Sequence, residues 1–212
     1  MKANYTIRVE EKKDYEIVEN LTREAFWNIY RPGCKEHYVL HCYRTNPDFI
    51  PELSLVMELD GKIIGHIMYS WSKINADDGK KIKVMTFGPI SIHPDYQRKG
   101  YGKALLDYSM EKAKKMGGGC ILIEGNINFY GKSGFIKCSE KGIKYADYNG
   151  DDDAPFFLCK ELDKDFLKNI TGSYRDPEGY FVCDKNPELF EEYDKKFPKK
   201  EKLKLPGQLF DQ

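Results

Sequence analysis

A loop with two glycines, placed between an apolar segment and a long amphipathic segment, restricts the fold of this 212-residue chain more than any other feature. The loop at residues 97–103 reads QRKGYGK, and residues 101–115 carry apolar side chains at helical spacing. Glycines let backbone N–H groups approach a ligand without a Cβ in the way, and a helix start directs unpaired donors at an anion. With Arg98, Lys99 and Lys103 beside them, the glycines predict a cradle for a pyrophosphate; a basic helix cap without a ligand is the alternative.

The overall charge argues against a polyanionic partner. The chain has 34 Lys and Arg against 34 Asp and Glu, whereas a nucleic-acid-binding protein normally has a basic excess. The basic run at residues 195–204 is short and contains a glutamate, so we interpret it as a solvated tail. No apolar run approaches the roughly 20 residues that cross a bilayer, and the N-terminal segment lacks the apolar core of a signal peptide. We therefore expect a cytoplasmic protein with no nucleic-acid or membrane partner, in which the six scattered cysteines are free thiols.

The hydrophobic pattern alternates strands and helices in an order typical of an α/β (α+β) domain. Asp60-Gly61 suits a two-residue hairpin turn between two strands. The pattern predicts strands at residues 5–9, 53–59, 62–71, 83–92, 120–124, 135–138 and 155–159, and helices at residues 14–30, 34–44, 101–115 and 128–132. From residue 163 onward, single aromatics stand among charged residues. We expect a domain at residues 1–162 and an extension at residues 163–212 that packs on the domain or on a partner subunit.

Gly88-Pro89 interrupts the strand predicted at residues 83–92. Proline donates no hydrogen bond to a neighbouring strand, and glycine in a strand marks a bulge or a close approach of another backbone or ligand. We therefore expect the sheet to bulge or splay here, with an opening beside Ile90, Ser91 and Ile92.

The two segments GPISIHPDYQRKGYGKALL (residues 88–106) and INFYGKSGF (residues 127–135) together resemble two motifs of the GCN5-related N-acetyltransferase (GNAT) superfamily. The first is similar to the acetyl-CoA signature Gln/Arg-x-x-Gly-x-Gly/Ala after a strand, and the second to a later Tyr-x-x-x-Gly-Phe motif. The resemblance covers about residues 5–162 and extends to an uncharacterised bacterial subgroup of predicted N-acetyltransferases. It implies a mixed, mostly antiparallel central sheet flanked by helices and splayed near the fourth strand.

The resemblance also implies how the residues act. Tyr130 matches the tyrosine that protonates the departing CoA thiolate, since the pKa of a phenol, about 10, lies near that of a thiol; a packed aromatic is the alternative. The family's asparagine seven positions earlier is replaced by Ile123, and Asn126 is the candidate to take over its contact to pantetheine. The residues expected to contact acetyl-CoA are Ile90, Ser91, Ile92, Gln97, Arg98, Lys99, Gly100, Tyr101, Gly102, Lys103, Asn126 and Phe129.

The acceptor side is less constrained. Amine acetylation needs a base to remove a proton from the ammonium form, and Glu124 at the end of an apolar strand is the first candidate, ahead of Glu58 and His66. In this superfamily the early helices form the acceptor wall, so Trp27, Tyr30, His37 and His41 are candidate substrate-binding residues, with helix core as the alternative. Cys34, His37 and His41 share one helix face, but no fourth ligand is apparent, and no metal is expected.

These expectations combine into one reaction. We expect transfer of an acetyl group from acetyl-CoA to an amine, on a small molecule or a peptide, by direct attack in a ternary complex. The alternative is a catalytically inactive CoA-binding sensor or scaffold protein. Whether the chain forms a homodimer is left open.

Overall fold

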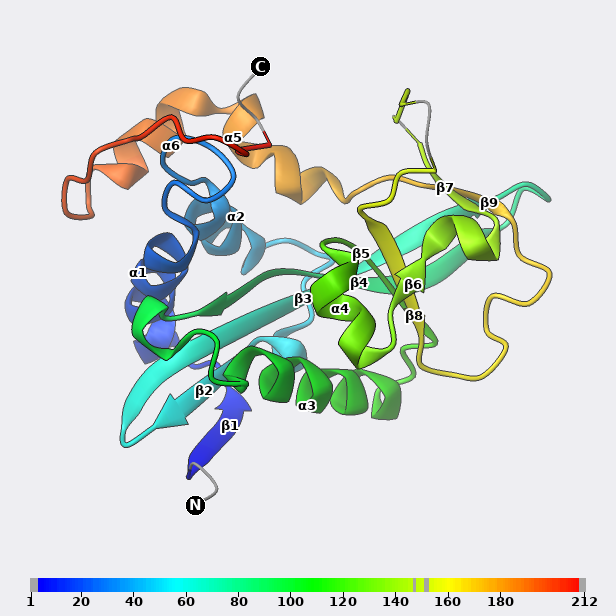
Figure 1. Cartoon of the computed structure of the whole chain (residues 1–212), viewed down its shortest axis with the longest axis horizontal. Coiled ribbons are helices and arrows are strands. Elements are labelled where there is room, and N and C mark those ends of the chain that lie inside the picture. The colour runs from blue at the N-terminus through cyan, green and yellow to red at the C-terminus, as the bar shows by residue number, and fades with distance from the viewer. Residues whose placement is uncertain (1–3, 147, 151–152, 210–212) are drawn as a thin grey trace. The chain divides into compact units, whose positions relative to one another are not determined.

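The computed structural model describes residues 4–146, 148–150 and 153–209, which form two compact units. The first unit comprises Met1–Met68, Pro89–Leu105 and Glu178–Gln212, and the second comprises Tyr69–Gly88 and Leu106–Pro177. Two strands, β3 (Lys62–Ala76) and β4 (Lys81–Ile92), and the helix α3 (Tyr101–Lys115) contribute to both units (Figure 1). Residues 1–3 of the predicted domain and residues 210–212 of the predicted extension lie outside the described residues, as do residues 147, 151 and 152.

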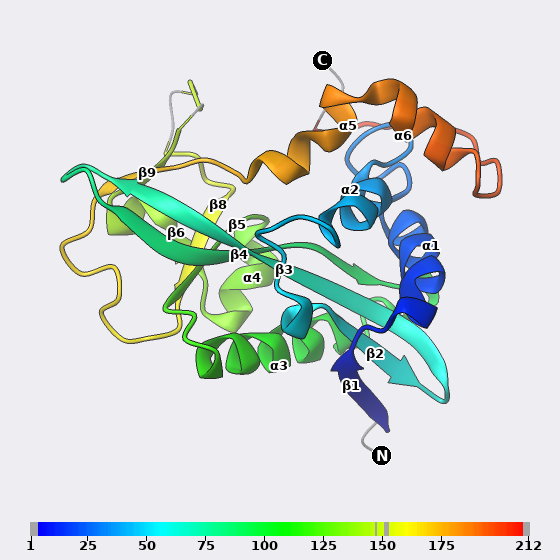
Figure 2. The same ribbon diagram turned by 180° about the vertical axis from the view of Figure 1, so that it is seen from behind.

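Antiparallel pairing builds the strands of the first unit in the order β1-β2-β3-β4. β1 (Tyr5–Val9) pairs antiparallel with β2 (Leu55–Leu59), and β2 pairs antiparallel with β3 (Figure 2). Asp60 and Gly61 connect β2 to β3 with φ angles of 50° and 74°. Positive φ at both central residues is the conformation of the tight hairpin turn, so the predicted hairpin is confirmed.

Helices α1 (Tyr15–Phe26) and α2 (Glu36–Tyr43) of the first unit share a hydrophobic core with side chains from residues 180–197. α1 is shorter than the helix predicted to reach residue 30, because Asn28 adopts a φ of 60° and its side-chain oxygen accepts a hydrogen bond from the Gly33 N–H. The predicted second helix is confirmed. The first unit also contains α5 (Val182–Lys185), α6 (Pro187–Asp194) and single 3₁₀ turns at Lys12–Asp14, Pro51–Leu53, Pro94–Tyr96 and Glu178–Phe181.

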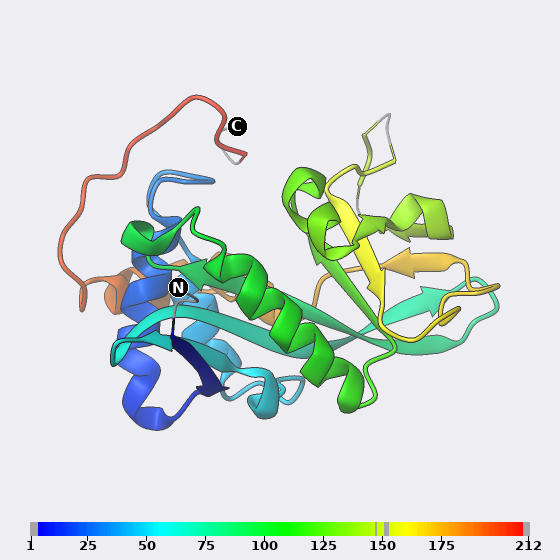
Figure 3. The same cartoon turned by 60° about the horizontal axis from the view of Figure 1, so that its bottom comes forward.

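The last part of the chain is fastened to the first unit by polar contacts. The buried Arg23 side chain forms an ion pair of 2.8 Å with Asp194 at the end of α6. Beyond α6, the Trp27 indole N–H and the Asn28 amide both donate to the carbonyl oxygen of Glu201. Figure 3 shows the backbone path of this last segment, coloured orange to red. The segment after α6 thus lies along the end of α1.

In the second unit the strand order is β3-β4-β5-β8-β6, with β9 pairing with β3 and β7. The elements are β5 (Cys120–Glu124), α4 (Ile127–Tyr130), a 3₁₀ turn (Gly131–Ser133), β6 (Ile136–Lys137), a 3₁₀ turn (Cys138–Lys141), β7 (Ile143–Tyr145), β8 (Phe157–Glu161) and β9 (Gly172–Tyr174). The sequence pattern did not predict β7 and β9. The six cysteines are free thiols.

The splay expected near the fourth strand appears in the pairing of β4 with β5. These strands run parallel, and Met85–Ile121 is their one register pair in the described part of the chain, whereas β5 pairs with β8 at five positions. β4 itself continues as a strand through Gly88-Pro89. The sheet is therefore mixed and mostly antiparallel, as the sequence predicts.

Candidate active site

The glycine-containing loop of the first unit is braced by its own polar side chains. The Gln97 amide donates to the Ile92 carbonyl oxygen over 2.9 Å, which ties the loop to the end of β4. The Lys99 ammonium donates to the Asp95 carbonyl oxygen over 2.8 Å, and the His93 ring accepts from the Asp95 N–H. These contacts fix the path of the chain between β4 and α3.

The backbone of this loop is shaped for a ligand that approaches closely. Arg98 and Gly100 have φ angles of 60° and 89°, in the left-handed region that favours glycine. A Cβ added to Gly100 would meet no atom within 4 Å, so open space lies beside it. α3 begins at Tyr101, and the first N–H groups of a helix lack partners within the helix. The loop therefore combines open space with backbone donors and the positive end of a helix dipole, which suits an anion.

Two of the residues near this loop that the sequence predicts to contact the cofactor have side chains that pack against other parts of the first unit. The Ser91 side chain is buried and its hydroxyl donates to the Thr22 hydroxyl over 3.0 Å, so Ser91 packs β4 on α1. The Tyr101 ring packs edge-on against the rings of Tyr5 and Tyr96. The side chains of Ser91 and Tyr101 are therefore engaged in packing within the protein.

In the second unit, Tyr130 is held by aromatic neighbours. Its ring centroid lies 4.8 Å from that of Phe129, 5.6 Å from Phe135 and 5.9 Å from Phe87. The short helix α4 that carries Tyr130 starts at Asn126, whose side-chain oxygen accepts a hydrogen bond from the Asn128 N–H over 2.9 Å. Asn126 thus caps the helix, and Phe129 is partly exposed beside Tyr130.

Glu124, the candidate base, lies in a cluster with Tyr145 and Asp176. The Tyr145 hydroxyl is 2.5 Å from a Glu124 carboxylate oxygen and 2.7 Å from an Asp176 carboxylate oxygen. Glu124 is exposed at the end of β5, but neighbouring atoms partly desolvate its carboxyl group, and this desolvation, followed by the nearby Asp176, raises the pKa of Glu124 to about 8. Burial and the same acidic neighbours raise the pKa of Tyr145 far above its ordinary value, which keeps this phenol protonated.

Sequence reasoning missed Tyr145 and Asp176. Tyr145 ends the short strand β7, and Asp176 follows β9, which is the strand that places it near Glu124. Neither residue belongs to a motif, so no local signal marks them.

The four residues predicted to line an acceptor pocket are not gathered in one cavity. His37 is fully buried, 3.0 Å from Asp194, and packed by aromatic rings of the terminal segment, so a dissolved substrate does not reach it. Trp27 is buried and donates to Glu201, as described above. Tyr30 is 40% exposed, and His41 is half-exposed with Nδ1 3.0 Å from a Glu19 carboxylate oxygen.

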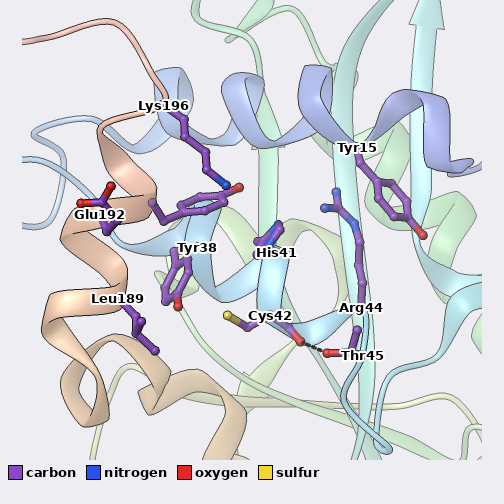
Figure 4. Close-up of a pocket in the computed structure, with 10 residues that line it drawn as sticks. Tyr15, Tyr38, His41, Cys42, Arg44, Thr45, Leu189, Glu192 and Lys196 are labelled. Carbon is purple, nitrogen blue, oxygen red and sulfur yellow. Dashed lines mark hydrogen bonds between the residues drawn. The ribbon is translucent and has the colours of Figure 1, made fainter.

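His41 lies in a groove of the first unit, formed by α1, α2 and α6 (Figure 4). The groove has a volume of about 490 Å³, and the hydroxyl of Tyr193, one of its lining residues, donates to Glu19 over 2.6 Å. The lining residues are Tyr15, Tyr38, His41, Cys42, Arg44, Thr45, Leu189, Glu192, Tyr193 and Lys196.

The comparison with known families now decides what these two sets of residues belong to. The model of the acetyltransferase (GNAT) family matches residues 22–135, more than half of the chain, and the match includes the glycine loop and Tyr130. The chain belongs to the GNAT family. The resemblance found in the sequence is confirmed.

This GNAT chain is similar to bacterial acetyltransferases, among them the following three. An uncharacterised N-acetyltransferase of Escherichia coli K12, YjhQ, is 24% identical over 141 residues, covering 66% of this chain and 74% of that protein. The GNAT N-acetyltransferase YhbS of Escherichia coli, solved with CoA, has a TM-score of 0.73 at 19% identity over 85% of this chain and 93% of its own. A GNAT acetyltransferase of Brucella melitensis, solved with acetyl-CoA, has a TM-score of 0.67 at 22% identity over 84% of this chain and 99% of its own. The two structures show that the fold is shared.

Two further observations concern the described part of this GNAT chain. Cys34 and His37 lie 3.4 Å apart, but His37 faces Asp194 while His41 faces Glu19, and no group of three or more Cys, His, Asp or Glu among the described residues is arranged to hold a metal ion. None of the described helices is long and apolar enough to span a membrane.

Proposed function

We propose that the chain transfers an acetyl group from acetyl-CoA to an amine by direct attack in a ternary complex. The observation that carries the proposal is the glycine loop, with its left-handed Arg98 and Gly100 and its position before α3. A pyrophosphate carries negative charge and accepts hydrogen bonds from backbone N–H groups, which is the chemistry that this loop offers. The CoA complexes of YhbS and of the Brucella melitensis enzyme support the same cofactor.

Tyr130 is the proposed general acid. When the tetrahedral intermediate collapses, the sulfur of CoA leaves with an electron pair and needs a proton. The phenol of Tyr130 supplies that proton, and the ring contacts with Phe87, Phe129 and Phe135 hold it in one orientation.

Glu124 is the proposed general base. An amine attacks only in its neutral form, so the ammonium must first lose a proton. A carboxylate with a pKa of about 8 is a much better proton acceptor than an ordinary glutamate. The acceptor is an amine of a small molecule or a peptide.

The test uses purified full-length protein, acetyl-CoA and a panel of small and peptide amines. Tyr130→Phe keeps the ring and removes the acidic proton, so we expect kcat to fall about 100-fold with little change in acetyl-CoA affinity. Tyr108→Phe, on the exposed side of α3, is the matched control and should keep full turnover. CoA binding without any amine-dependent release of CoA would overturn the proposal and favour the sensor.

A further inference from the structure

We infer that Tyr145 and Asp176 are positioning residues for Glu124, and that they set how tightly its carboxylate holds the one proton that the acceptor amine must lose. The inference rests on the proposed function and extends it to residues outside the matched family segment at 22–135. It assigns a role to a strand and a loop of the second unit that the sequence motifs do not include.

The three side chains come from separate parts of the chain. Glu124 ends β5, Tyr145 ends β7, and Asp176 follows β9. β7 and β9 pair in parallel, with Tyr145 opposite Tyr174, so Asp176 follows two residues after the partner of Tyr145. Strand pairing thus fixes the phenol between the two carboxyl groups.

The number of hydrogens in this cluster is the central argument. The hydroxyl group of a phenol has one hydrogen, so the Tyr145 hydroxyl donates to one carboxylate at a time. Its oxygen nevertheless lies 2.5 Å from Glu124 and 2.7 Å from Asp176. With both carboxyl groups ionised, one of these short contacts would have no hydrogen between its oxygens. A proton on one of the two carboxyl groups resolves this. If Glu124 holds it, Glu124 donates to Tyr145 and Tyr145 donates to Asp176.

Charge favours the same arrangement. Partial desolvation of the Glu124 carboxyl disfavours its charged form, and the nearby Asp176 acts in the same direction. The Tyr145 hydroxyl opposes both effects, since it stabilises the ionised form of Glu124 as a donor. The other elements beside Glu124 contribute Phe157 of β8, directly opposite in register, and Tyr130 of α4.

The cluster lies next to the proposed acid. The Tyr130 ring packs against Gly125, the residue that follows Glu124, at a distance that leaves no room for a Cβ. Glu124, the proposed base, and Tyr130, the proposed acid, are therefore both next to Gly125.

The step is balanced in protons. The ionised Glu124 takes one proton from the acceptor ammonium and becomes a carboxylic acid, leaving a neutral amine. The amine nitrogen forms a bond to the acetyl carbonyl carbon, the carbon–sulfur bond breaks, and Tyr130 protonates the sulfur. The nitrogen releases its second proton, which restores Tyr130, and Glu124 later returns its proton to water.

The first experiment measures the protonation of Glu124 directly, in full-length protein without an acceptor. The ¹³C chemical shift of its carboxyl carbon is followed against pH and assigned with Glu124→Gln. We expect a midpoint near 8 in the native protein. Asp176→Asn removes a negative charge and should lower the midpoint by about one unit, whereas Tyr145→Phe removes a donor to the ionised form and should raise it. A merely structural role would not move the midpoint in opposite directions, and unchanged midpoints in both variants would overturn the inference.

The second experiment follows kcat/KM for an accepted amine against pH. The rate should rise with pH as Glu124 ionises, and Asp176→Asn should move this rise to lower pH by the shift seen in the titration. A shifted midpoint with an unmoved rate profile would overturn the role in turnover. If the native protein acetylates no amine, the proposed function fails, while the titration still decides whether Tyr145 and Asp176 set the protonation of Glu124. Asp78→Asn, an exposed acid on a turn of the same unit, is the control for a general loss of charge.

Discussion

The ring of Tyr130 lies directly over the backbone of Gly125. A Cβ added to Gly125 would come within 2.4 Å of Tyr130 Cε2 and 2.6 Å of Cδ2. Real Cβ atoms do not approach other atoms so closely, so the ring occupies this position only because residue 125 is glycine. This contact keeps Tyr130, the proposed acid, beside the residue that follows Glu124, the proposed base.

Replacing Gly125 with alanine should displace the Tyr130 ring and lower turnover. A displacement of about 1 Å costs up to about 100-fold in rate when the displaced group takes part in proton transfer, so we expect kcat to fall between 10-fold and 100-fold. Gly131→Ala is the control, because Gly131 has a helical φ of −57° and its Cβ would meet Ile127 at an ordinary 3.6 Å. Steady-state kinetics with an accepted amine make the comparison, and equal kcat in the two variants would show that the ring position is not important.

Replacing Gly100 with alanine should weaken binding of CoA. The Cβ meets no protein atom, but alanine at a φ of 89° is strained by about 1–2 kcal/mol, so the loop should relax away from its present shape. Gly61→Ala is the matched control, since Gly61 has a φ of 74° and equally open surroundings in the β2–β3 turn. Calorimetry should show weaker CoA binding for Gly100→Ala and unchanged CoA binding for Gly61→Ala, although alanine is strained at both positions. Equal affinities would count against the loop as the pyrophosphate site.

The sequence was sufficient for elements whose structure is determined locally. Asp60-Gly61 specified a hairpin turn, and the period of residues 101–115 specified α3. β7 and β9 were missed because each has three residues, too few for an alternating pattern, and becomes a strand by pairing with another strand. Asp176 was missed for the same reason.

The sequence was insufficient where a side chain has a remote partner. Spacing placed His37 and His41 on one helix and indicated a shared role, yet each faces a different carboxylate. The partner of His37 is Asp194, which lies far along the chain in a segment whose periodicity gave no sign of where it packs. Tyr130 and the glycine loop, in contrast, stand in motifs and were recognised from local sequence alone.

Replacing Asp194 with asparagine should destabilise the first unit. Burial raises the pKa of Asp194, but hydrogen bonds from His37 and Arg23 outweigh burial and hold this pKa well below its ordinary value. The charged form is thus favoured by folding, and the variant leaves the buried Arg23 without its counter-charge. We expect a loss of roughly 2–3 kcal/mol in the free energy of unfolding, less than for a fully buried pair because Asp194 is 15% exposed.

Urea denaturation at pH 7 measures this loss. Lys195→Ala, which removes an exposed pair with Glu192, should leave stability nearly unchanged and serves as the control. Because the folded-state pKa of Asp194 is depressed, its stabilisation is present above the unfolded pKa and disappears as the pH falls below it. The difference between native and Asp194→Asn proteins should therefore shrink on acidification, and a constant difference would contradict this account.

His66 should make the folded state sensitive to mild acid. It is fully buried on β3, near Glu10 and Arg44, and burial lowers its pKa to about 4. The unfolded chain binds a proton at about pH 6.5 and the folded chain only at about pH 4, so stability falls as the pH is lowered through this window. The full loss of unfolding free energy is roughly 3 kcal/mol by that difference in pKa.

His66→Gln cannot take up the proton, and its unfolding free energy should therefore decline less between pH 6.5 and 4 than that of the native protein. His93→Gln, at a half-exposed position, is the control for replacing a histidine. Parallel declines in the native and His66→Gln proteins would show that another group, rather than the buried imidazole, makes the fold acid-sensitive.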